Sequence, residues 1–330
     1  MMKRRAWAAI GASLIVSVAL AAEPPQPDAK AVSTLLTKAR TLAWPDLYTT
    51  YVQRCITAQA YPQYVNDLQR PGALPATRVF DQLYFVGENA VSAWAINTPE
   101  GIILFDALNG PEDVAGTIVP GLKKLGLDAS RIRYIVLTHA HGDHYGGVNA
   151  LKALSGARVV STALDWQEID RQRTRMPEGL PAEWGKLAPE RDMTVAEGDT
   201  LSLGGVQLRF YVTPGHTPGT LSTVFDVTDN RKPHRVALFG GLGLPRTEAG
   251  LRQYSASLER FAGVARELKV DTVIANHQTQ DDSRVKLEEL KWRTDEAHPY
   301  VLGPSAVPRF FEVQAICGRV ALARMGMASR

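Results

Sequence analysis

Short apolar runs alternate with longer amphipathic stretches along the chain, and their order predicts the fold. Runs rich in Val, Ile, Phe and Tyr, bounded by Gly, Asn and Pro turns, predict strands. We expect these strands at residues 78–86, 91–97, 101–106, 132–137, 157–161, 200–203, 206–212, 221–226, 235–239 and 271–275. We expect helices at residues 112–125, from about 146 and about 163, and at 251–268, 281–292 and 307–324. The order predicts an α/β fold of two similar halves, a four-layer αββα sandwich of two mixed sheets with helices outside.

The first 77 residues have a different pattern from the rest. Residues 1–22 carry three basic residues, an apolar run and an A-x-A site, which together predict a secretory signal peptide. A membrane anchor is the alternative, but the run of about 15 apolar residues is shorter than the roughly 20 that span a bilayer. We predict that residues 23–77 form an N-terminal extension, which is helical over residues 30–68. Three roles are open for it: packing on the rim, closing the cleft or mediating association. Residues 78–330 then form the main domain.

Composition and charge exclude some classes of function. Hydrophobic residues make up 45% of the chain and charged residues 22%, which is ordinary for a globular protein. Without residues 1–22 the chain carries 34 basic and 34 acidic side chains, so nothing indicates a nucleic-acid partner. We expect a periplasmic or secreted protein with a small-molecule substrate and no membrane contact after signal removal. The sequence does not fix the oligomeric state.

The chain has two cysteines, Cys55 and Cys317. In an oxidising compartment an even pair predicts one disulfide, which would join the extension to the C-terminal helix. The alternative is two buried free thiols that only pack.

Five of the seven histidines fall in three motifs. Residues 139–144 read His-Ala-His-Gly-Asp-His after a buried strand, residue 216 lies in Thr-Pro-Gly-His-Thr-Pro-Gly, and residue 277 lies in Ala-Asn-His. Each motif follows a predicted strand, where open α/β sheets collect their ligands. His and Asp are ordinary zinc ligands, and three of them with one open position make a catalytic site.

The six side chains divide into two candidate metal sites. The first set is His139, His141 and His216, and the second is Asp143, His144 and His277. Zinc suits these ligands, although ligand softness alone leaves iron and manganese open. A lone histidine is more often a packed or surface residue, so His216 and His277 gain their weight from the 139–144 motif. His234 and His298 lack such flanks, and we expect both on the surface.

Taken together, the motifs resemble those of the metallo-β-lactamase fold superfamily, over roughly residues 78–326. They are most similar to its third subclass, which binds one zinc by three histidines and another by Asp-His-His. The resemblance implies two Zn²⁺ ions per chain and β-lactams as the leading substrate.

The chain departs from its relatives at one place. Glyoxalase-type and lactonase-type members carry a bridging Asp after the strand that ends near residue 239, where this chain has Gly240 and Gly241. Third-subclass lactamases usually have a serine in this region that binds the drug carboxylate, and no serine occurs between residues 228 and 255. Arg246 is the remaining candidate for that contact.

The predicted function is therefore a secreted dizinc hydrolase. Zinc lowers the pKa of bound water to about 7, and the resulting zinc-bound hydroxide attacks a carbonyl. Asp143 is the predicted catalytic residue because it binds the second zinc and orients the nucleophile, and Tyr145 or Asn276 would orient the ligands. The alternative substrates are another ester, a lactone, or a phosphorylated or sulfated compound. A zinc-binding protein without catalysis, its cleft blocked, is the alternative from a different class.

Residues 166–192 have two interpretations. They form a lid that sets substrate choice, with Trp184 as a substrate contact, or a surface excursion whose Trp184 packs on the body. The sequence does not decide between them.

Overall fold

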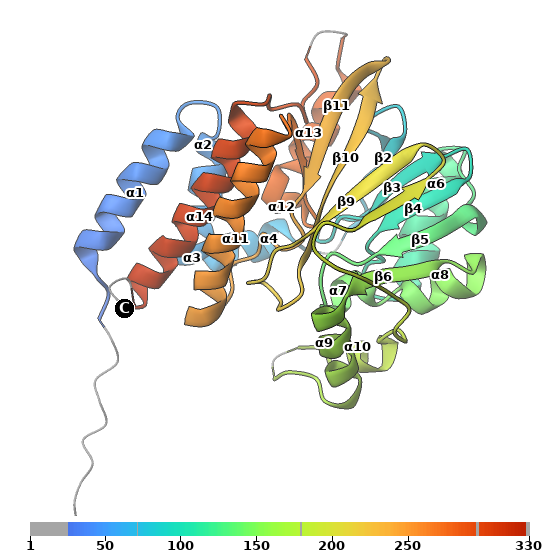
Figure 1. Cartoon of the computed structure of the whole chain (residues 1–330), viewed down its shortest axis with the longest axis horizontal. Helices are drawn as coiled ribbons and strands as arrows, with labels where there is room; N and C mark the ends of the chain where they lie inside the picture. The colour runs from blue at the N-terminus through green and yellow to red at the C-terminus, as the bar shows by residue number, and fades with distance from the viewer. Residues whose placement is uncertain (1–25, 71, 179, 295–296, 328–330) are drawn as a thin grey trace, which may run out of the picture.

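The computed structural model describes residues 26–70, 72–178, 180–294 and 297–327. The predicted signal peptide, residues 1–22, lies outside the described residues. Within these ranges the strands form two sheets, one of seven strands and one of five (Figure 1). The larger sheet contains β1 (Thr77–Arg78), β2 (Leu83–Phe85), β3 (Trp94–Thr98), β4 (Gly101–Phe105), β5 (Ile132–Val136), β6 (Arg158–Thr162) and β7 (Met193–Val195). The smaller sheet contains β8 (Thr200–Leu203), β9 (Val206–Val212), β10 (Leu221–Asp229), β11 (Lys232–Leu238) and β12 (Thr272–Ile274).

The helices surround these sheets. The extension holds α1 (Ala29–Ala43), α2 (Tyr48–Tyr51), a π-helical turn (Val52–Thr57), α3 (Ala58–Ala60) and α4 (Pro62–Leu68). Between β4 and β7 the chain forms α5 (Pro111–Asp113), a π-helical turn (Val114–Ile118), α6 (Val119–Lys124), a 3-10 turn (Ala129–Arg131), α7 (Gly142–Tyr145), α8 (Val148–Ser155), α9 (Ala163–Thr174) and α10 (Ala182–Leu187). The rest of the chain holds α11 (Glu248–Glu267), α12 (Gln278–Asp281), α13 (Ser283–Lys291) and α14 (Ala306–Arg324).

Both sheets are mixed, as predicted. The larger sheet runs in the order β1 to β7, antiparallel as far as β4 and parallel from β4 to β7. The smaller sheet runs β12-β11-β10-β9-β8, with one parallel pair, β11 and β12. Parallel strands place their carboxyl ends at one edge, so loops distant in sequence meet there.

The apolar side chains divide into three layers of core. Alternate residues of β4 and β5 point to opposite faces, so Phe105 and Val136 face the other sheet while Leu104 and Ile135 face helices. The Phe105 and Phe225 rings stack across the two sheets with centroids 5.6 Å apart. Helices α6, α8 and α9 cover the larger sheet, and α11 and α14 cover the smaller one (Figure 1). The predicted αββα sandwich is confirmed.

The N-terminal extension packs on the helical layer of the smaller sheet. Ala39 and Ala43 of α1 share a core with Phe311 of α14. A disulfide joins Cys55 to Cys317, and this prediction is confirmed. The domain boundary near residue 77 stays a prediction.

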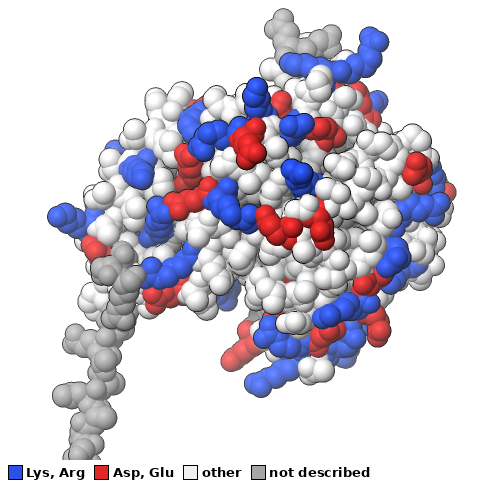
Figure 2. Space-filling model, in the orientation of Figure 1, with Lys and Arg blue, Asp and Glu red and all other residues white. Residues whose placement is uncertain are grey.

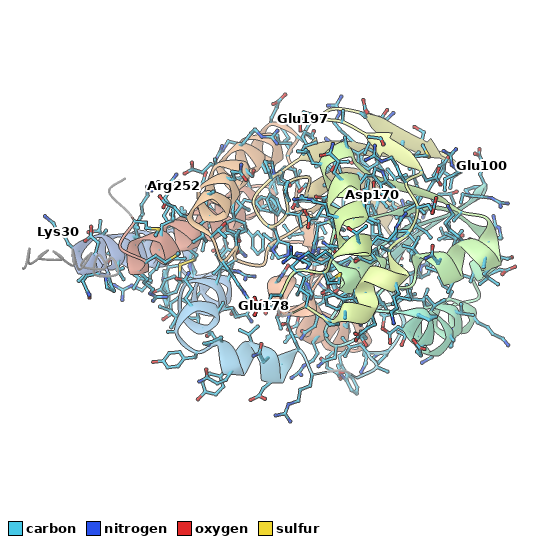
Figure 3. All side chains as sticks on the ribbon, turned by 90° about the horizontal axis from the view of Figure 1, so that it is seen from below. Lys30, Glu100, Asp170, Glu178, Glu197 and Arg252 are labelled. Atoms are coloured by element: carbon cyan, nitrogen blue, oxygen red, sulfur yellow. A yellow bond between two sulfur atoms is a disulfide. The ribbon has the colours of Figure 1, made fainter. Side chains whose placement is uncertain are left out.

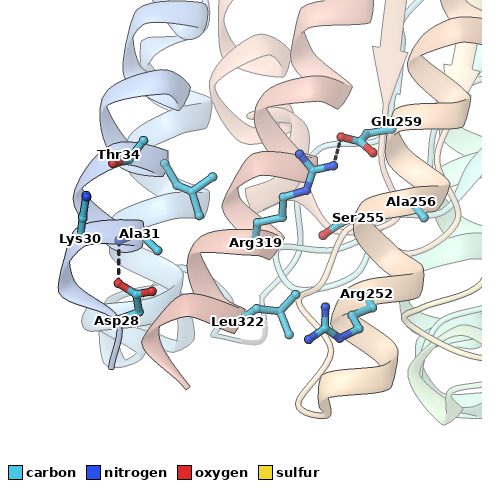
Figure 4. A pocket seen from close by; sticks show the side chains of 11 residues that line it. Asp28, Lys30, Ala31, Thr34, Arg252, Ser255, Ala256, Glu259, Arg319 and Leu322 are labelled. Atoms are coloured by element: carbon cyan, nitrogen blue, oxygen red, sulfur yellow. Dashed lines mark hydrogen bonds and ion pairs between the residues drawn. The ribbon is translucent and has the colours of Figure 1, made fainter. Parts of the chain in front are cut away.

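A cavity of about 630 Å³ lies at the seam between α1, α11 and α14 (Figure 4). Leu35 and Leu322 form part of its apolar wall, while Arg319 pairs with Glu259 at its edge. Among the described residues that line this cavity, none belongs to the two predicted metal sets. The cavity therefore reflects how the extension is docked rather than the metal chemistry.

Two local predictions are wrong. Residues 78–86 are not one strand but a tight hairpin, because the Val79 and Phe80 amides both donate to the Leu83 carbonyl. His234 and His298 are 6% and 7% exposed and not on the surface: the rings of both lie beside that of Phe80. The helix predicted over 281–292 is confirmed as α13, which begins after Asp282, a residue with a φ of 60°.

Charge is distributed without a single dominant sign. Figure 2 shows Lys and Arg side chains intermingled with Asp and Glu on the face that it presents. None of the helices in the described ranges has the length and apolarity needed to cross a membrane.

We expect the disulfide to contribute substantially to stability, because it closes a loop with a sequence separation of 262. Replacing both Cys55 and Cys317 by serine should lower the free energy of unfolding by roughly 2–5 kcal/mol. Urea denaturation of the double variant beside the oxidised and reduced wild type measures this. Equal midpoints for all three proteins would show that the bridge is energetically neutral.

Candidate metal centre

The three histidine motifs meet at one edge of the sandwich. The 139–144 motif follows β5 of the larger sheet, and the loop with His216 follows β9 of the smaller sheet. His277 follows β12, at the far end of that smaller sheet. The fold thus brings together the six side chains that the sequence singled out.

The first cluster consists of His139, His141 and His216. One ring nitrogen from each lies within 4.8 Å of the others, and His139 Nε2 is 3.1 Å from His141 Nδ1. The His216 ring lies 4.4 Å from the His139 ring and 4.8 Å from the His141 ring, measured between centroids. Ligand nitrogens bound to one tetrahedral zinc at about 2.0–2.1 Å would lie about 3.3 Å apart, so this spacing fits a metal ion.

The second cluster consists of Asp143, His144 and His277. His144 Nε2 is 3.2 Å from His277 Nε2 and 3.4 Å from Asp143 Oδ2. The His277 Nε2 atom is 3.6 Å from the same carboxylate oxygen. The three atoms form a nearly equilateral triangle, which again matches the edge of a zinc coordination tetrahedron.

Hydrogen bonds on the far side of each ring set the tautomers. The Nδ1 atoms of His139 and His216 lie 2.8 Å from the carbonyl oxygens of Gly240 and Gly243, so each must carry the proton and donate it. The Nδ1 of His277 donates to the Ala90 carbonyl at 2.9 Å in the same way. The Nε2 lone pairs of these rings therefore face the cluster centres, where acceptors would repel one another unless a cation lay between them.

Asp106 fixes the ring of His144. Its Oδ2 accepts the His144 Nδ1 proton at 2.8 Å, while both its carboxylate oxygens also accept from Thr138, at 2.8 Å each. A carboxylate behind a ligating histidine orients the ring and increases its basicity. Asp106 has a φ of 61°, a left-handed conformation that Asp tolerates better than most residues.

The electrostatics of the first cluster also suit metal binding. Burial, with a smaller contribution from His144, holds the pKa of His139 well below its usual value. Burial, reinforced by His141, does the same to the pKa of His216. Both rings are therefore neutral near pH 7, with their lone pairs available.

In the second cluster a proton competes with the cation. Burial would lower the pKa of His144, but the Asp143 and Asp106 carboxylates raise it to about 10. Burial raises the pKa of Asp143, yet His144 and His277 outweigh it, so the net shift is downward. Burial and then His144 lower the pKa of His277 to about 4. A metal ion bound here would take the place of the proton on His144 Nε2, beside Asp143, while Nδ1 keeps its bond to Asp106.

The predicted substrate contacts lie in different surroundings. Trp184 packs on the metal loop so closely that a Cβ on Gly142 would lie 2.1 Å from its ring. Arg246 is exposed, three residues beyond the Gly243 carbonyl that orients His216. Figure 3 labels Glu178 in the segment after α9. The structure therefore favours packing for Trp184, and its role as a substrate contact, like that of Arg246, stays a prediction.

The glycines at the predicted departure leave no room for a side chain. A Cβ on Gly240 would lie 2.2 Å from the Leu221 carbonyl oxygen and 2.7 Å from that of Thr138. A Cβ on Gly241 would lie 2.6 Å from the Cβ of His216. This backbone cannot present a bridging carboxylate at either position without moving.

Sequence reasoning missed part of the supporting set. Asp106 directly follows β4, and a carboxylate at the end of a buried strand is the signal in the sequence that indicates it. The sequence offered Tyr145 or Asn276 as the residue that orients the ligands. Asn276 does so directly, since its amide donates to Gly240 O and Thr138 Oγ1, at 2.8 Å each. Tyr145 acts indirectly, because its hydroxyl donates to the side chain of Gln172 at 2.8 Å.

The extension reaches the rim of the second cluster. Asn89 Nδ2 donates to the carbonyls of Leu68 and Arg70 at 2.8 Å each, and Gln278 Nε2 donates to Leu68 at 3.0 Å. Asn89 precedes Ala90, whose carbonyl orients His277. The segment after α4 therefore braces the backbone on both sides of that histidine.

Residues 86–231 match the family model described as the Metallo-beta-lactamase superfamily. Among solved structures, the fold is similar to BJP-1, a subclass B3 metallo-β-lactamase of Bradyrhizobium japonicum. The identity is 26% and the TM-score 0.61, over 74% of this chain and 90% of that one. It is also similar to the FEZ-1 metallo-β-lactamase of Legionella gormanii, with 22% identity and a TM-score of 0.62, over 74% and 93% of the two chains. The resemblance predicted from the motifs is confirmed.

The relatives that match in sequence are named differently from the structural matches. A hydroxyacylglutathione hydrolase of Methylococcus capsulatus is 31% identical over 177 residues, which is 52% of this chain and 57% of the relative. One of Rhodopseudomonas palustris (strain BisA53) is 32% identical over 133 residues, 40% and 45% of the two chains. The chain thus spans about half the length of these relatives.

We expect two zinc ions per chain, with one lost when either lone histidine is removed. His216→Ala should empty the first site and His277→Ala the second, because each site needs three protein ligands. Atomic emission on dialysed protein gives the zinc content. His234→Asn is the matched control because its ring bonds Asp271 instead of joining either cluster. A control that loses as much zinc as His277→Ala would contradict the assignment.

We expect Gly240→Ala to be destabilising, because its methyl would meet two carbonyl oxygens. The loss should be about 1–3 kcal/mol in the free energy of unfolding, with weaker zinc binding, since Gly240 O orients His139. Gly263→Ala on α11 is the control, where an added Cβ has nothing within 4 Å. Thermal unfolding of both variants tests this. Equal midpoints would mean that the loop yields easily.

Proposed function

We propose that this metallo-β-lactamase superfamily domain is a two-zinc hydrolase that cleaves a carbonyl–heteroatom bond in an ester, thioester or lactone. The observation that carries the proposal is the pair of three-atom clusters. The ligand atoms of the first lie within 4.8 Å of one another, and those of the second are separated by 3.2–3.6 Å. Each cluster supplies three ligands and so leaves a zinc position open for solvent or substrate.

The chemistry follows from this ligand set. Two zinc ions held there would polarise a carbonyl oxygen and lower the pKa of a water nucleophile. His139, His141 and His216 would hold the first ion as neutral ligands, as their tautomers require. Asp143, His144 and His277 would hold the second.

The protein's own groups then orient the reactants. Asp143 keeps a lowered pKa, so it remains an anion that can accept a hydrogen bond from the attacking water. Asp106, behind His144, keeps that ring from rotating. Because burial excludes bulk water from Asp106, this orientation costs no reorganisation during the reaction.

Thioester and ester substrates are supported by the relatives that match in sequence, which are named for hydroxyacylglutathione hydrolysis. The closed Gly240–Gly241 backbone qualifies this support: it has no space for the bridging Asp of glyoxalase-type members. If thioesters are the substrate, the two ions must be held without that bridge.

A β-lactam ring is the second candidate. It is supported by the likeness in fold to a subclass B3 enzyme over 90% of that enzyme's length at 26% identity. The missing serine weakens it, because β-lactams carry a carboxylate that must be recognised. Arg246 is the group that we propose for that contact.

We also propose that the protein acts outside the cytoplasm. The Cys55–Cys317 disulfide supports this, since such bonds persist in oxidising compartments. The signal peptide predicted at residues 1–22 agrees with it.

A parallel substrate assay tests the proposal. Zinc-loaded protein, before and after chelation, is given a hydroxyacyl thioester of glutathione, an aryl ester, a γ-lactone and nitrocefin. We expect chelator-sensitive turnover of at least one of the first three. Asp143→Asn should lower kcat by at least 10–100-fold, roughly the loss caused even by residues behind the ligands. Asp170→Asn, an exposed carboxylate on α9, is the matched control.

The outcomes separate the candidates. A higher kcat/KM for nitrocefin than for every ester or thioester would replace the first candidate with the second. No chelator-sensitive turnover of any of the four by protein that holds two zinc ions would contradict both, and would favour binding without catalysis.

A further inference from the structure

One buried carboxylate lies behind the first cluster without belonging to it. Asp165, in the first turn of α9, has no exposed surface. Its Oδ1 accepts from the Gly219 amide at 2.8 Å, and its Oδ2 accepts from Thr217 Oγ1 at 2.8 Å. The Ala140 amide donates to the same carboxylate.

These donors come from the two loops that carry the first cluster. Ala140 lies between His139 and His141, after a strand of the larger sheet, while Thr217 follows His216 on a loop of the smaller sheet. A single carboxylate therefore bonds both loops at the place where the two sheets contribute ligands to one metal ion.

Helix α9 makes a second hydrogen bond to the loop that carries His139 and His141. Gln172 Nε2 donates to the Ala140 carbonyl at 2.7 Å, so α9 holds both the amide and the carbonyl of that residue. Asp165 and Gln172 are seven residues apart, which places them on one helix face. The face of α9 that meets the metal loop is thus polar at two points.

The loop that carries His216 packs tightly against the start of α9. A Cβ on Gly219 would lie 2.1 Å from Thr162 Oγ1 and 2.8 Å from Asp165 Oδ1. Thr162 caps α9 by accepting from the Asp165 amide at 3.2 Å, and its hydroxyl donates to the Gly219 carbonyl at 2.8 Å. The cap holds Asp165 at the helix start, and its carboxylate is free to bond the loops.

The Asp165 carboxylate accepts hydrogen bonds from several donors. Two amides and a hydroxyl point at it, and an ionised carboxylate is an acceptor at both oxygens. Burial raises the pKa of Asp165 to about 7, although the bonds from Thr217, Gly219 and Ala140 oppose the shift. An amide would turn its NH₂ group toward at least one of these donors.

We propose that Asp165 is a positioning residue that locks the His139–His141 loop to the His216 loop, so that the three histidines converge on one metal ion. This inference rests on the proposed function for the identity of the site. If Asp165 merely stabilised α9, its loss would weaken the whole fold and both metal sites alike. A lock between these two loops acts on the first site, because Asp143, His144 and His277 have their own supports.

Metal affinity measured site by site tests this. Zinc is titrated into apoprotein against a chromophoric chelator, and His216→Ala and His277→Ala assign each binding step to a site. Asp165→Asn should weaken the first step by about 10–100-fold, while the second changes by less than about threefold. Asp170→Asn is the control, since it lies on the same helix with a side chain 45% exposed (Figure 3).

Two further measurements keep the outcome decisive. Thr217→Val removes one of the three bonds and should weaken the same step by a smaller factor, which decides the matter if Asp165→Asn does not fold. Cobalt bound at the first site should show an altered visible spectrum in Asp165→Asn. An unchanged first step, or equal losses at both steps, would overturn the proposal. Because no substrate is used, an inactive wild type that still shows the selective loss would refute only the proposed function.

Discussion

The site depends on lone pairs that are aimed at each other. Among the described residues, His139, His144, His216 and His277 each give their Nδ1 proton to an acceptor behind the ring. The opposite nitrogens then face inward at separations that only a cation or a shared proton makes favourable. The rest of the architecture can be understood as the means of supplying these acceptors: three main-chain carbonyls and one buried carboxylate.

Two sheets are needed because no single loop can hold such an arrangement. The 139–144 motif provides ligands to both clusters from one turn, but it needs two partner histidines from the smaller sheet, one after β9 and one after β12. The 7-stranded and 5-stranded sheets pack through aromatic contacts such as Phe105 on Phe225, and this packing fixes where those partners lie. Glycines at 240 and 241 let the backbones approach closely enough for the Gly240 and Gly243 carbonyls to reach the rings of His139 and His216.

Much of this could be predicted from the sequence, for identifiable reasons. Buried strands such as residues 132–136 are continuous apolar runs, and a motif as dense in ligands as 139–144 has no purpose in packing, so both were visible. Asp106, Asp165 and Gln172 were not, because each bonds groups on a distant segment, such as Thr138, Thr217 and Ala140, which no local pattern specifies. His234 and His298 were misplaced for the same reason, since their burial against Phe80 depends on how two distant segments pack. Substrate choice is still harder to predict, because it depends on the rim of the cleft rather than on the ligands.

The bond between Cys55 and Cys317 makes most of the polypeptide a covalent ring. A single backbone cut inside that ring opens it without releasing a fragment. The exposed Glu178 lies within the ring, and so do the three metal-ligand motifs. A nicked molecule would therefore keep its two pieces tethered, and would migrate as an intact chain until a reductant separated them.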